Sequence, residues 1–327
     1  MDFCANSAIS PEHIGSEVET ELLALAARAG ELAGCSRAPS TIKTYRSDWN
    51  QFENWCEAHN QPALPSNGLV VSLYIVKLAE EGIRPATIEK KLTSISQRHK
   101  IAGCQPPTAS VQVREVLKGI KRQIGTKQDQ KAPLDAPKLK KAVGALPDDI
   151  AGIRNSALLL IGFSAALRRS ELVALDVADL RFTSAGLVIT IRRSKTDQYG
   201  SGRVVGVPRA SDSAFCPVDS LKNWLHQSGI TTGPVFRGID RHGKIRSKRL
   251  STHGVSLIIK KAVKRIGLNP EKYSGHSLRS GFATSAARAG LSEHQIRKTT
   301  GHTSSAMVRR YVRDEQLFPD EQIKRLL

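Results

Sequence analysis

The spacing of apolar residues constrains the fold of this 327-residue chain more than any other feature. Over residues 40–124, apolar side chains recur every three or four positions, which is the spacing of one helix face. The spacing changes to alternation in residues 186–195 and again in 203–207, and the turn residues between them predict a β-hairpin. Helical spacing returns from about residue 218. We therefore predict a mainly α chain whose second half carries a small β-sheet, an α+β arrangement.

A polar stretch at residues 125–137 divides the chain. It contains two prolines and has no hydrophobic period, so we interpret it as a linker. Residues 36–124 before it are expected to form an all-helical domain, and residues 138–327 after it a mixed domain that ends in a tail helix. Residues 1–35 form an acidic leader with one short helix, at about 18–32. That helix is expected to pack on its own domain, with docking on a partner as the alternative.

Net charge is the unusual feature of the composition. Lys and Arg number 49 against 30 Asp and Glu, which gives a net charge of +19 and a pI near 10.0. Residues 131–327 carry 34 basic and 16 acidic side chains, a net of +18, whereas residues 1–34 carry a net of −5. A compact body with such an excess favours a polyanion that releases counterions on binding. Nucleic acid is therefore the expected partner.

Several other classes of protein do not fit the sequence. No stretch reaches the roughly 18 apolar residues of a membrane span, and the N-terminus lacks the basic start and apolar core of a signal peptide. We therefore expect a cytoplasmic protein. The five cysteines are widely spaced without a Cys-x-x-Cys pair, which disfavours a disulfide framework or a zinc knuckle. Neither a glycine-rich phosphate loop nor a His-Glu-x-x-His motif is present, so no cofactor and no metal are expected.

The residues that could take part in a chemical reaction lie in the basic second half of the chain. His276 and Arg279 are three positions apart at the start of a predicted helix, hence on one face. Arg168 follows an apolar run, with Glu171 three positions later. Taken alone, each pair is explained as well by a structural role or a solvated surface. Composition does not choose between these interpretations.

Taken together and in order, these residues resemble the tyrosine recombinases, also called phage integrases. The set begins with Leu-Arg168-x-Ser-Glu171 and continues with a hairpin lysine at Arg-Ser-Lys195-Thr, His276-x-x-Arg279, Gly-His302 and Tyr311. Its order over about 145 residues makes it specific, whereas His-x-x-Arg alone is weak. The resemblance covers about residues 36–327 and points to Cre-like members, with an all-α core-binding domain before the catalytic domain.

The resemblance implies how the central residues act. Tyr311 is the implied nucleophile, which attacks a DNA phosphodiester, forms a 3′-phosphotyrosyl bond and frees a 5′-hydroxyl. Arg168 and Arg279 are implied to hold the non-bridging oxygens and to stabilise the transition state, a role that metals play elsewhere. Because the covalent bond stores the energy of the broken phosphodiester, the resemblance implies that no ATP is needed. The two arginines are implied to replace a metal.

The remaining residues are implied to move protons or to support the site. Lys195 protonates the leaving 5′-oxygen, and His276 acts as an acid and base toward the tyrosine or contacts the phosphate. His302 donates to the phosphate, although some family members carry Trp there. Glu171 accepts from neighbouring donors and holds the site together.

Two of these positions have alternatives nearby. Arg169 could replace Arg168 as the phosphate clamp, but only Arg168 directly follows a leucine with a glutamate three positions later. Arg192 or Arg193 could replace Lys195, but the Lys-Thr dipeptide just before the turn favours the lysine.

The activity implied by the resemblance is site-specific DNA recombination through a Holliday junction. Its partners are a double-stranded DNA with an inverted-repeat target site and, on two synapsed duplexes, a homo-tetramer of a protein that is monomeric when free. No membrane is involved, and the protein is expected in the cytoplasm, associated with the nucleoid when bound to DNA. The alternatives are a type IB topoisomerase-like nicking-closing enzyme and a non-catalytic DNA-binding regulator.

Overall fold

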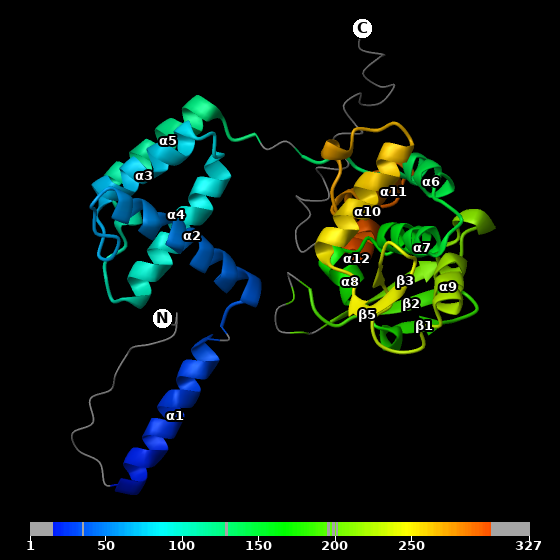
Figure 1. The fold of residues 1–327 in the computed structure, drawn as a ribbon, viewed down its shortest axis with the longest axis horizontal. Coiled ribbons are helices and arrows are strands. Elements are labelled where there is room, and N and C mark those ends of the chain that lie inside the picture. Colours follow the sequence, from blue (N-terminus) through cyan, green and yellow to red (C-terminus); the bar gives the residue numbers. More distant parts are fainter. Residues whose placement is uncertain are drawn as a thin grey trace. The chain divides into compact units, whose positions relative to one another are not determined.

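The structure of the protein is a computed structural model. It describes residues 16–34, 36–127, 130–194, 197, 200 and 202–301. The chain divides into two compact units, a helical unit of residues 1–129 and a mixed unit of residues 130–327 (Figure 1). Three of the predicted site residues, Lys195, His302 and Tyr311, lie outside the described residues.

The described part of the helical unit is all helical, as predicted. Its elements are α1 (Ser16–Gly34), α2 (Pro39–Ala58), α3 (Gly68–Glu80), α4 (Pro85–Ile101), the 3-10 turn η1 (Pro107–Ala109) and α5 (Val111–Ile124). Local signals fix these boundaries. Asn67 and Ser110 accept hydrogen bonds from the first turns of α3 and α5, and Pro85 opens α4 where no backbone N–H is required.

Helices α2 to α5 enclose one hydrophobic core. Its largest members include Trp49, Phe52, Tyr74 and Ile75. A buried lysine joins α2 to α4, because Lys91 Nζ donates to Asp48 Oδ1 at 3.1 Å and to Gln51 Oε1 at 2.6 Å. The charge of Lys91 is thus neutralised inside the unit, as a buried cation requires.

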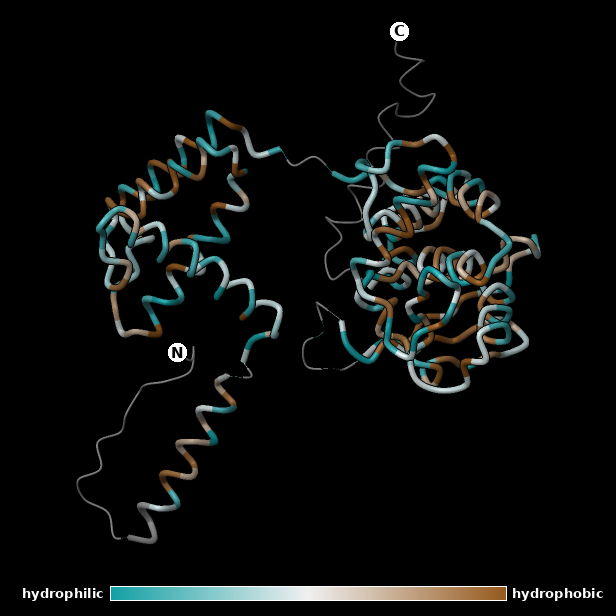
Figure 2. The backbone as a smooth tube through the Cα atoms, viewed as in Figure 1, coloured by the Kyte–Doolittle hydropathy of each residue, from teal (hydrophilic) through white to brown (hydrophobic). Residues whose placement is uncertain are grey.

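Helix α1 differs from its prediction. Its leucines remain open to solvent, with exposed fractions of 44% for Leu22, 63% for Leu23, 56% for Leu25 and 57% for Leu32. Hydrophobic and hydrophilic residues alternate along this helix (Figure 2). The expectation that it packs on its own domain is therefore wrong for these side chains, because no described residues cover them. No described helix is long and apolar enough to cross a membrane.

The mixed unit combines helices with two small antiparallel sheets. Its elements are α6 (Ala136–Gly144), α7 (Ile150–Ser164), α8 (Arg169–Ala174), η2 (Val177–Asp179), β1 (Leu180–Phe182), β2 (Gly186–Ile191), β3 (Arg203–Pro208), η3 (Ser213–Phe215), α9 (Pro217–Ser228), β4 (Arg237–Ile239), β5 (Ile245–Arg249), α10 (Thr252–Arg265), η4 (Pro270–Lys272), α11 (Ser277–Arg288) and α12 (Glu293–Thr300). The predicted mainly α fold with a small β-sheet is confirmed.

The larger sheet has the order β1-β2-β3, and its β2–β3 pair is the predicted hairpin. The register places Ile191, the last residue of β2, opposite Arg203, the first residue of β3. Alternate residues of both strands face the core, including Ile189 and Val205. The strand pairing therefore ends four residues before Lys195, which lies in the connection between β2 and β3.

A close backbone contact fixes the segment that enters the mixed unit. Leu134 N–H donates to the carbonyl of Ser277, the first residue of α11, at 2.9 Å. The carbonyl of Leu134 lies so near Gly281 that a Cβ there would be 1.9 Å from the oxygen. Only glycine fits at this point of α11. The linker therefore ends directly against the helix that carries Arg279.

The buried His99 makes the stability of the helical unit dependent on pH. Its Nε2 accepts from the Ser66 N–H at 3.0 Å, so Nδ1 carries the proton and faces the Ile95 carbonyl at 2.9 Å. Burial lowers the pKa of His99 below its ordinary 6.5. As pH falls below that value, the unfolded chain binds a proton that the folded state does not, so stability declines.

Between pH 7 and 5, we expect the stability of the helical unit to fall less in His99→Phe than in the wild type. The same substitution at the exposed His59 should leave the decline unchanged. Hydrogen exchange of α4 in the full chain, corrected for the intrinsic rate at each pH, measures the effect. An unchanged pH slope in His99→Phe would contradict the assignment.

Candidate active site

The turn between α7 and α8 presents Arg168. The hydrogen bonds Ala166 N to Phe163 O (2.9 Å) and Leu167 N to Gly162 O (3.0 Å) end α7 in a Schellman arrangement. Ala166 occupies the left-handed position of this turn, with φ +49°, where glycine is usual. A non-glycine residue in this conformation stores backbone strain, which is frequent at functional sites.

Glu171 anchors Arg168 by both its backbone and its side chain. The Arg168 N–H donates to Glu171 Oε2 at 2.9 Å, and Arg168 Nη1 donates to Oε1 at 2.6 Å. The Glu171 side chain is only 1% exposed. A carboxylate buried to this extent requires positive partners. The predicted pairing of these two residues is therefore present in the structure.

A second arginine, from a distant part of the sequence, shares the same carboxylate. Arg203 Nη2 donates to Glu171 Oε2 at 3.2 Å, and Arg203 Nη1 donates to the carbonyl of Thr299 at 2.8 Å. The sequence analysis did not identify Arg203. Its only local mark is its place at the start of the predicted return strand, which does not distinguish it from a surface arginine.

Arg279 is the most deeply buried arginine of the site. It lies in the first turn of α11 and is 1% exposed. Its Nη1 donates to the carbonyl of Ala166 at 2.8 Å. This hydrogen bond ties α11 to the strained turn that precedes Arg168. The structure thus brings Arg168 and Arg279, the two predicted phosphate ligands, to one place.

His276 stands at the N-terminus of α11, as predicted from its spacing to Arg279. The residue keeps much of its surface open to solvent, yet protein atoms surround enough of the ring to desolvate it. This burial, followed by the positive charges of Arg279 and Arg168, lowers the pKa of His276 below 6.5. The imidazole is therefore neutral near pH 7 and can accept a proton.

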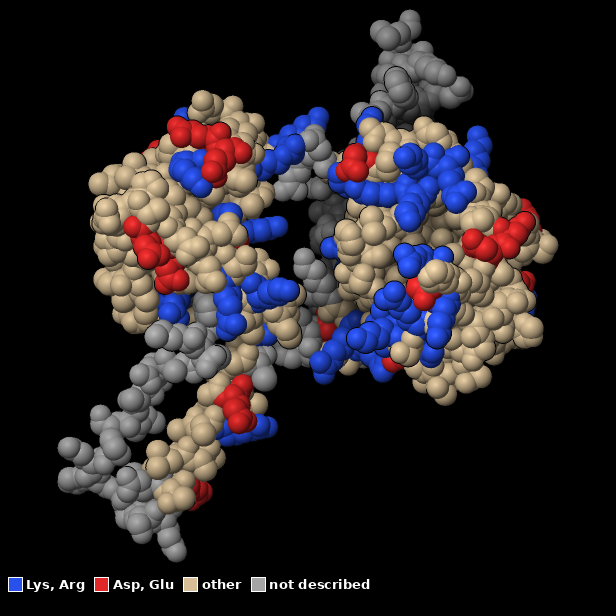
Figure 3. Space-filling model, in the orientation of Figure 1, with Lys and Arg blue, Asp and Glu red and all other residues tan. Residues whose placement is uncertain are grey.

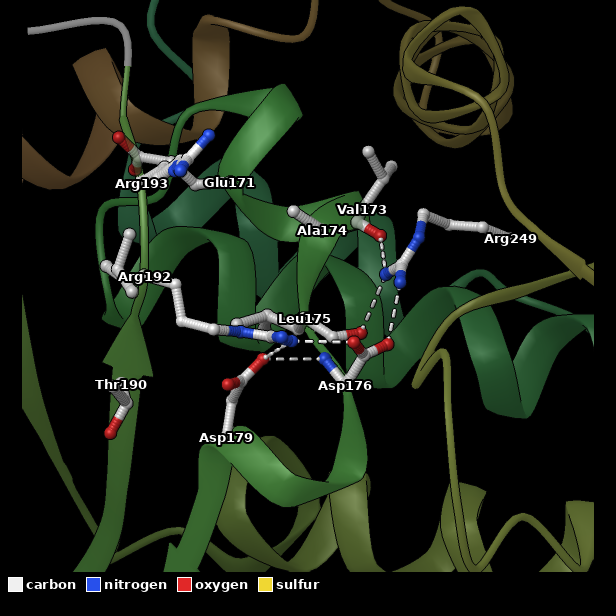
Figure 4. Close-up of a pocket in the computed structure, with 11 residues that line it drawn as sticks. Glu171, Val173, Ala174, Leu175, Asp176, Asp179, Thr190, Arg192, Arg193 and Arg249 are labelled. Atoms are coloured by element: carbon white, nitrogen blue, oxygen red, sulfur yellow. Dashed lines mark hydrogen bonds and ion pairs between the residues drawn. The ribbon is translucent and has the colours of Figure 1, made fainter. Parts of the chain in front are cut away.

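An ion-pair network lies beside the end of β2, around an open cavity of about 390 Å³ (Figure 4). Arg192 Nη2 donates to Asp176 at 2.6 Å and to Asp179 at 2.7 Å. Arg249 donates to Asp176 at 2.6 Å and to two carbonyl oxygens at the end of α8. The hydrogen bond from Arg192 is the main cause that lowers the pKa of Asp176. These contacts anchor the base of the hairpin to α8.

Arg169, which directly follows Arg168, has different surroundings. Arg169 lies across Gly275, where a Cβ would be 2.8 Å from its Cδ, and its Nη1 approaches Ser256 Oγ at 3.4 Å. The Arg169 side chain is therefore directed toward the segment before His276 and toward α10. Of these two adjacent arginines, Arg168 is the one with a hydrogen bond to Glu171.

Helix α12 ends at the sequence motif that contains His302. Gly301 caps the helix in the left-handed conformation, with φ +64°, and its N–H donates to the Arg297 carbonyl at 2.7 Å. A Cβ at Gly301 would also lie 3.0 Å from Arg203 Nε. The left-handed conformation favours glycine here, and the Arg203 side chain leaves little room for a Cβ. Within the part of the chain that the structure describes, no three His, Cys, Asp or Glu side chains form a group that could hold a metal ion.

Comparison with known proteins decides the family. Residues 133–317, more than half of the chain, match the model of the phage integrase family. The chain belongs to the phage integrase family, the tyrosine recombinases. The resemblance that the motif set indicated is therefore confirmed.

Relatives of this phage integrase family member cover nearly the whole chain. An integrase/recombinase named as a xerD homolog of Selenomonas ruminantium is 37% identical over 295 residues, 89% of this chain and 86% of that protein. The recombinase Cre of Escherichia phage P1 is 26% identical over 293 residues, 84% of each chain. A crystal structure of XerH site-specific recombinase bound to a palindromic difH substrate has a TM-score of 0.61 at 20% identity, over 95% of this chain and 84% of that one. The last comparison establishes the fold.

The strained turn before Arg168 yields a stability prediction. Replacing either Ala165 or Ala166 by glycine removes a buried methyl, worth about 0.8 kcal/mol, and makes the unfolded chain more flexible. Only at Ala166 does glycine also relieve left-handed strain of about 1–2 kcal/mol. Ala166→Gly should therefore be nearly neutral, and Ala165→Gly should cost about 1–2 kcal/mol.

Urea unfolding of the two full-length variants provides the measurement. Ala165 has an ordinary negative φ of −90° and serves as the matched control. Equal losses of stability in the two variants would show that the Ala166 turn carries no strain.

Proposed function

We propose that this protein is a site-specific DNA recombinase that cuts and rejoins DNA through a 3′-phosphotyrosyl intermediate. Membership of the phage integrase family supports the reaction class. The observation that carries the proposal is the meeting of Arg168, Glu171, Arg279 and His276 around one strained turn. Two guanidinium groups beside a neutral imidazole suit an anionic, five-coordinate phosphoryl group.

In the proposed first step, the Tyr311 hydroxyl attacks the scissile phosphorus. A bond from phosphorus to the tyrosine oxygen forms, and the bond from phosphorus to the 5′-oxygen breaks. His276 accepts the tyrosine proton, and Lys195 supplies a proton to the leaving 5′-oxygen. In the second step a 5′-hydroxyl of the partner strand attacks the phosphotyrosine and releases Tyr311, so the number of phosphodiester bonds is conserved.

Arg168 and Arg279 are proposed to bind the non-bridging oxygens throughout, and His302 to donate to one of them. Guanidinium groups suit this better than ammonium, because they donate two parallel hydrogen bonds. The pairing of Arg192 with Asp176 and Asp179 supports Lys195 as the proton donor from the hairpin, since that arginine is engaged elsewhere.

DNA is the proposed polyanion. Exposed basic side chains lie on β5 and just after β2, including Arg246, Lys248 and Arg193. Figure 3 shows Lys and Arg side chains gathered on this side of the mixed unit, where Figure 1 labels β5. Such charges contact backbone phosphates and make affinity depend on salt. The helical unit is proposed to act as the core-binding domain on the same duplex.

The proposed assembly is Cre-like. Two protomers bind the inverted half-sites of one duplex, and two duplexes pair in a tetramer that exchanges strands through a Holliday junction. The similarity to Cre over 84% of the chain supports this choice, as does the name of the xerD homolog. The C-terminal tail helix is proposed to dock on a neighbouring protomer.

The direct test is covalent capture of DNA. We expect wild-type protein, incubated with a library of nicked duplexes, to become covalently linked to one family of sequences, which also reveals the target site. Tyr311→Phe should bind the same duplex and form no adduct, because phenylalanine has no nucleophilic oxygen. Tyr45→Phe in the helical unit is the matched control and should form the adduct normally.

An adduct that persists in Tyr311→Phe would refute the nucleophile. Relaxation of supercoiled DNA without recombinant product from a plasmid with two captured sites would instead favour the nicking-closing alternative. Sequence-specific binding without any adduct from the wild-type protein would favour the regulator.

A further inference from the structure

Arg203 links three parts of the candidate site, namely the start of β3, helix α8 and the end of α12. Its backbone begins β3 opposite Ile191, so it stands at the root of the connection that carries Lys195. Its side chain reaches Glu171 of α8 and Thr299 of α12. Helix α8, strand β3 and helix α12 together span about 130 residues of sequence, and no local pattern relates them.

The two terminal nitrogens of Arg203 contact protein acceptors. Nη2 binds Glu171, which also binds Arg168, and Nη1 binds the Thr299 carbonyl in the last turn of α12. The side chain is 21% exposed and passes directly under Gly301. Burial lowers the pKa of Arg203 from its ordinary value, and the carboxylate of Glu171 opposes this effect. The guanidinium is therefore engaged on two sides by fixed groups.

These contacts differ from those expected of a phosphate ligand. A ligand needs terminal N–H groups directed at substrate, whereas both terminal nitrogens of Arg203 donate to the protein. The acceptors belong to segments that end at proposed catalytic residues, Arg168 on one side and His302, directly after Gly301, on the other. A displacement of about 1 Å in such groups can cost about 10²-fold in rate.

We propose that Arg203 is a positioning residue, which holds the Glu171–Arg168 pair and the C-terminal end of α12 in one fixed arrangement around the scissile phosphate. This inference rests on the proposed recombinase function. Arg203 acts through Glu171 and Thr299, and it does not supply the proton to the leaving group.

The test uses full-length protein and a nicked duplex that carries the captured target sequence. Arg203→Met keeps an unbranched apolar stem and removes the guanidinium, and Arg203→Lys keeps one charge without the two-sided fork. Arg181→Met is the matched control, because Arg181 is exposed on β1 and has no polar contact among the described residues. The readouts are the rate constant and the amplitude of adduct formation at saturating DNA.

We expect Arg203→Met to lower the rate constant about 10²-fold, with Arg203→Lys between it and the wild type, while the amplitude and the DNA affinity stay the same. Arg181→Met should react at the wild-type rate. If Arg203 merely supported folding, the amplitude would fall with the fraction of folded protein and the rate constant would not. That result overturns the inference, as does a wild-type rate in Arg203→Met.

A second substrate separates positioning of the phosphate ligands from positioning of Lys195. In this duplex sulfur replaces the bridging 5′-oxygen, so the phosphorus–sulfur bond breaks and a thiolate leaves without needing a proton. The sulfur-substituted duplex should restore the rate of adduct formation in Lys195→Ala. In Arg203→Met that rate should remain low. Equal restoration of both variants would show that Arg203 acts through the hairpin and would overturn the inference. Absence of any adduct from the wild-type protein would instead refute the proposed function itself, and this inference with it.

Discussion

The catalytic end of the mixed unit depends on one buried carboxylate. Glu171 is almost fully removed from water and is neutralised by Arg168, three residues away, and by Arg203, 32 residues away. A buried carboxylate requires positive partners, and Glu171 has two, so the arrangement resists separation of its members and keeps one partner when the other is removed. The same interaction therefore orients a proposed phosphate ligand and joins the start of β3 to α8.

The second constraint on the site is the strained turn at Ala166. Its carbonyl accepts from the buried Arg279, and its left-handed backbone directs the chain toward Arg168. On the other side of α11, Gly281 admits the Leu134 carbonyl at a distance that no side chain allows. Helix α11 is thus held between the incoming linker segment and the turn that precedes α8. Both contacts fix the guanidinium of Arg279 before any substrate is present.

Sequence reasoning succeeded where the physical signal was local. Helical spacing predicted α2 to α5, and alternation predicted the β2–β3 hairpin, because each pattern repeats within a few residues. The pair His276–Arg279 could be predicted because residues three apart share a helix face. Arg168 and Glu171 were marked by their place after an apolar run. The ordered set that relates these pairs required the family resemblance, since composition does not distinguish a catalytic arginine from a solvated one.

The contacts that sequence reasoning missed are long-range. Arg203 meets Glu171 and Thr299 only after the sheet and α12 are in place, and nothing near Arg203 in sequence marks it. Strands β4 and β5 were missed because they are short and rich in charged residues, which weakens the alternation. The exposed leucines of α1 show a different limit of sequence analysis. An apolar helix face predicts that some surface will cover it, but it does not identify that surface.

We infer that Glu171 holds Arg168 in position to bind the scissile phosphate, with Arg203 fixing the carboxylate from its other side. This inference is tested most directly by the single-turnover rate of adduct formation for Glu171→Gln at saturating DNA. Glutamine has nearly the same size, but it carries no charge and accepts through one oxygen only. We predict a rate about 10²-fold lower than that of the wild type, without loss of DNA affinity or of helical circular dichroism. A folded Glu171→Gln protein that cleaves at the wild-type rate would contradict it.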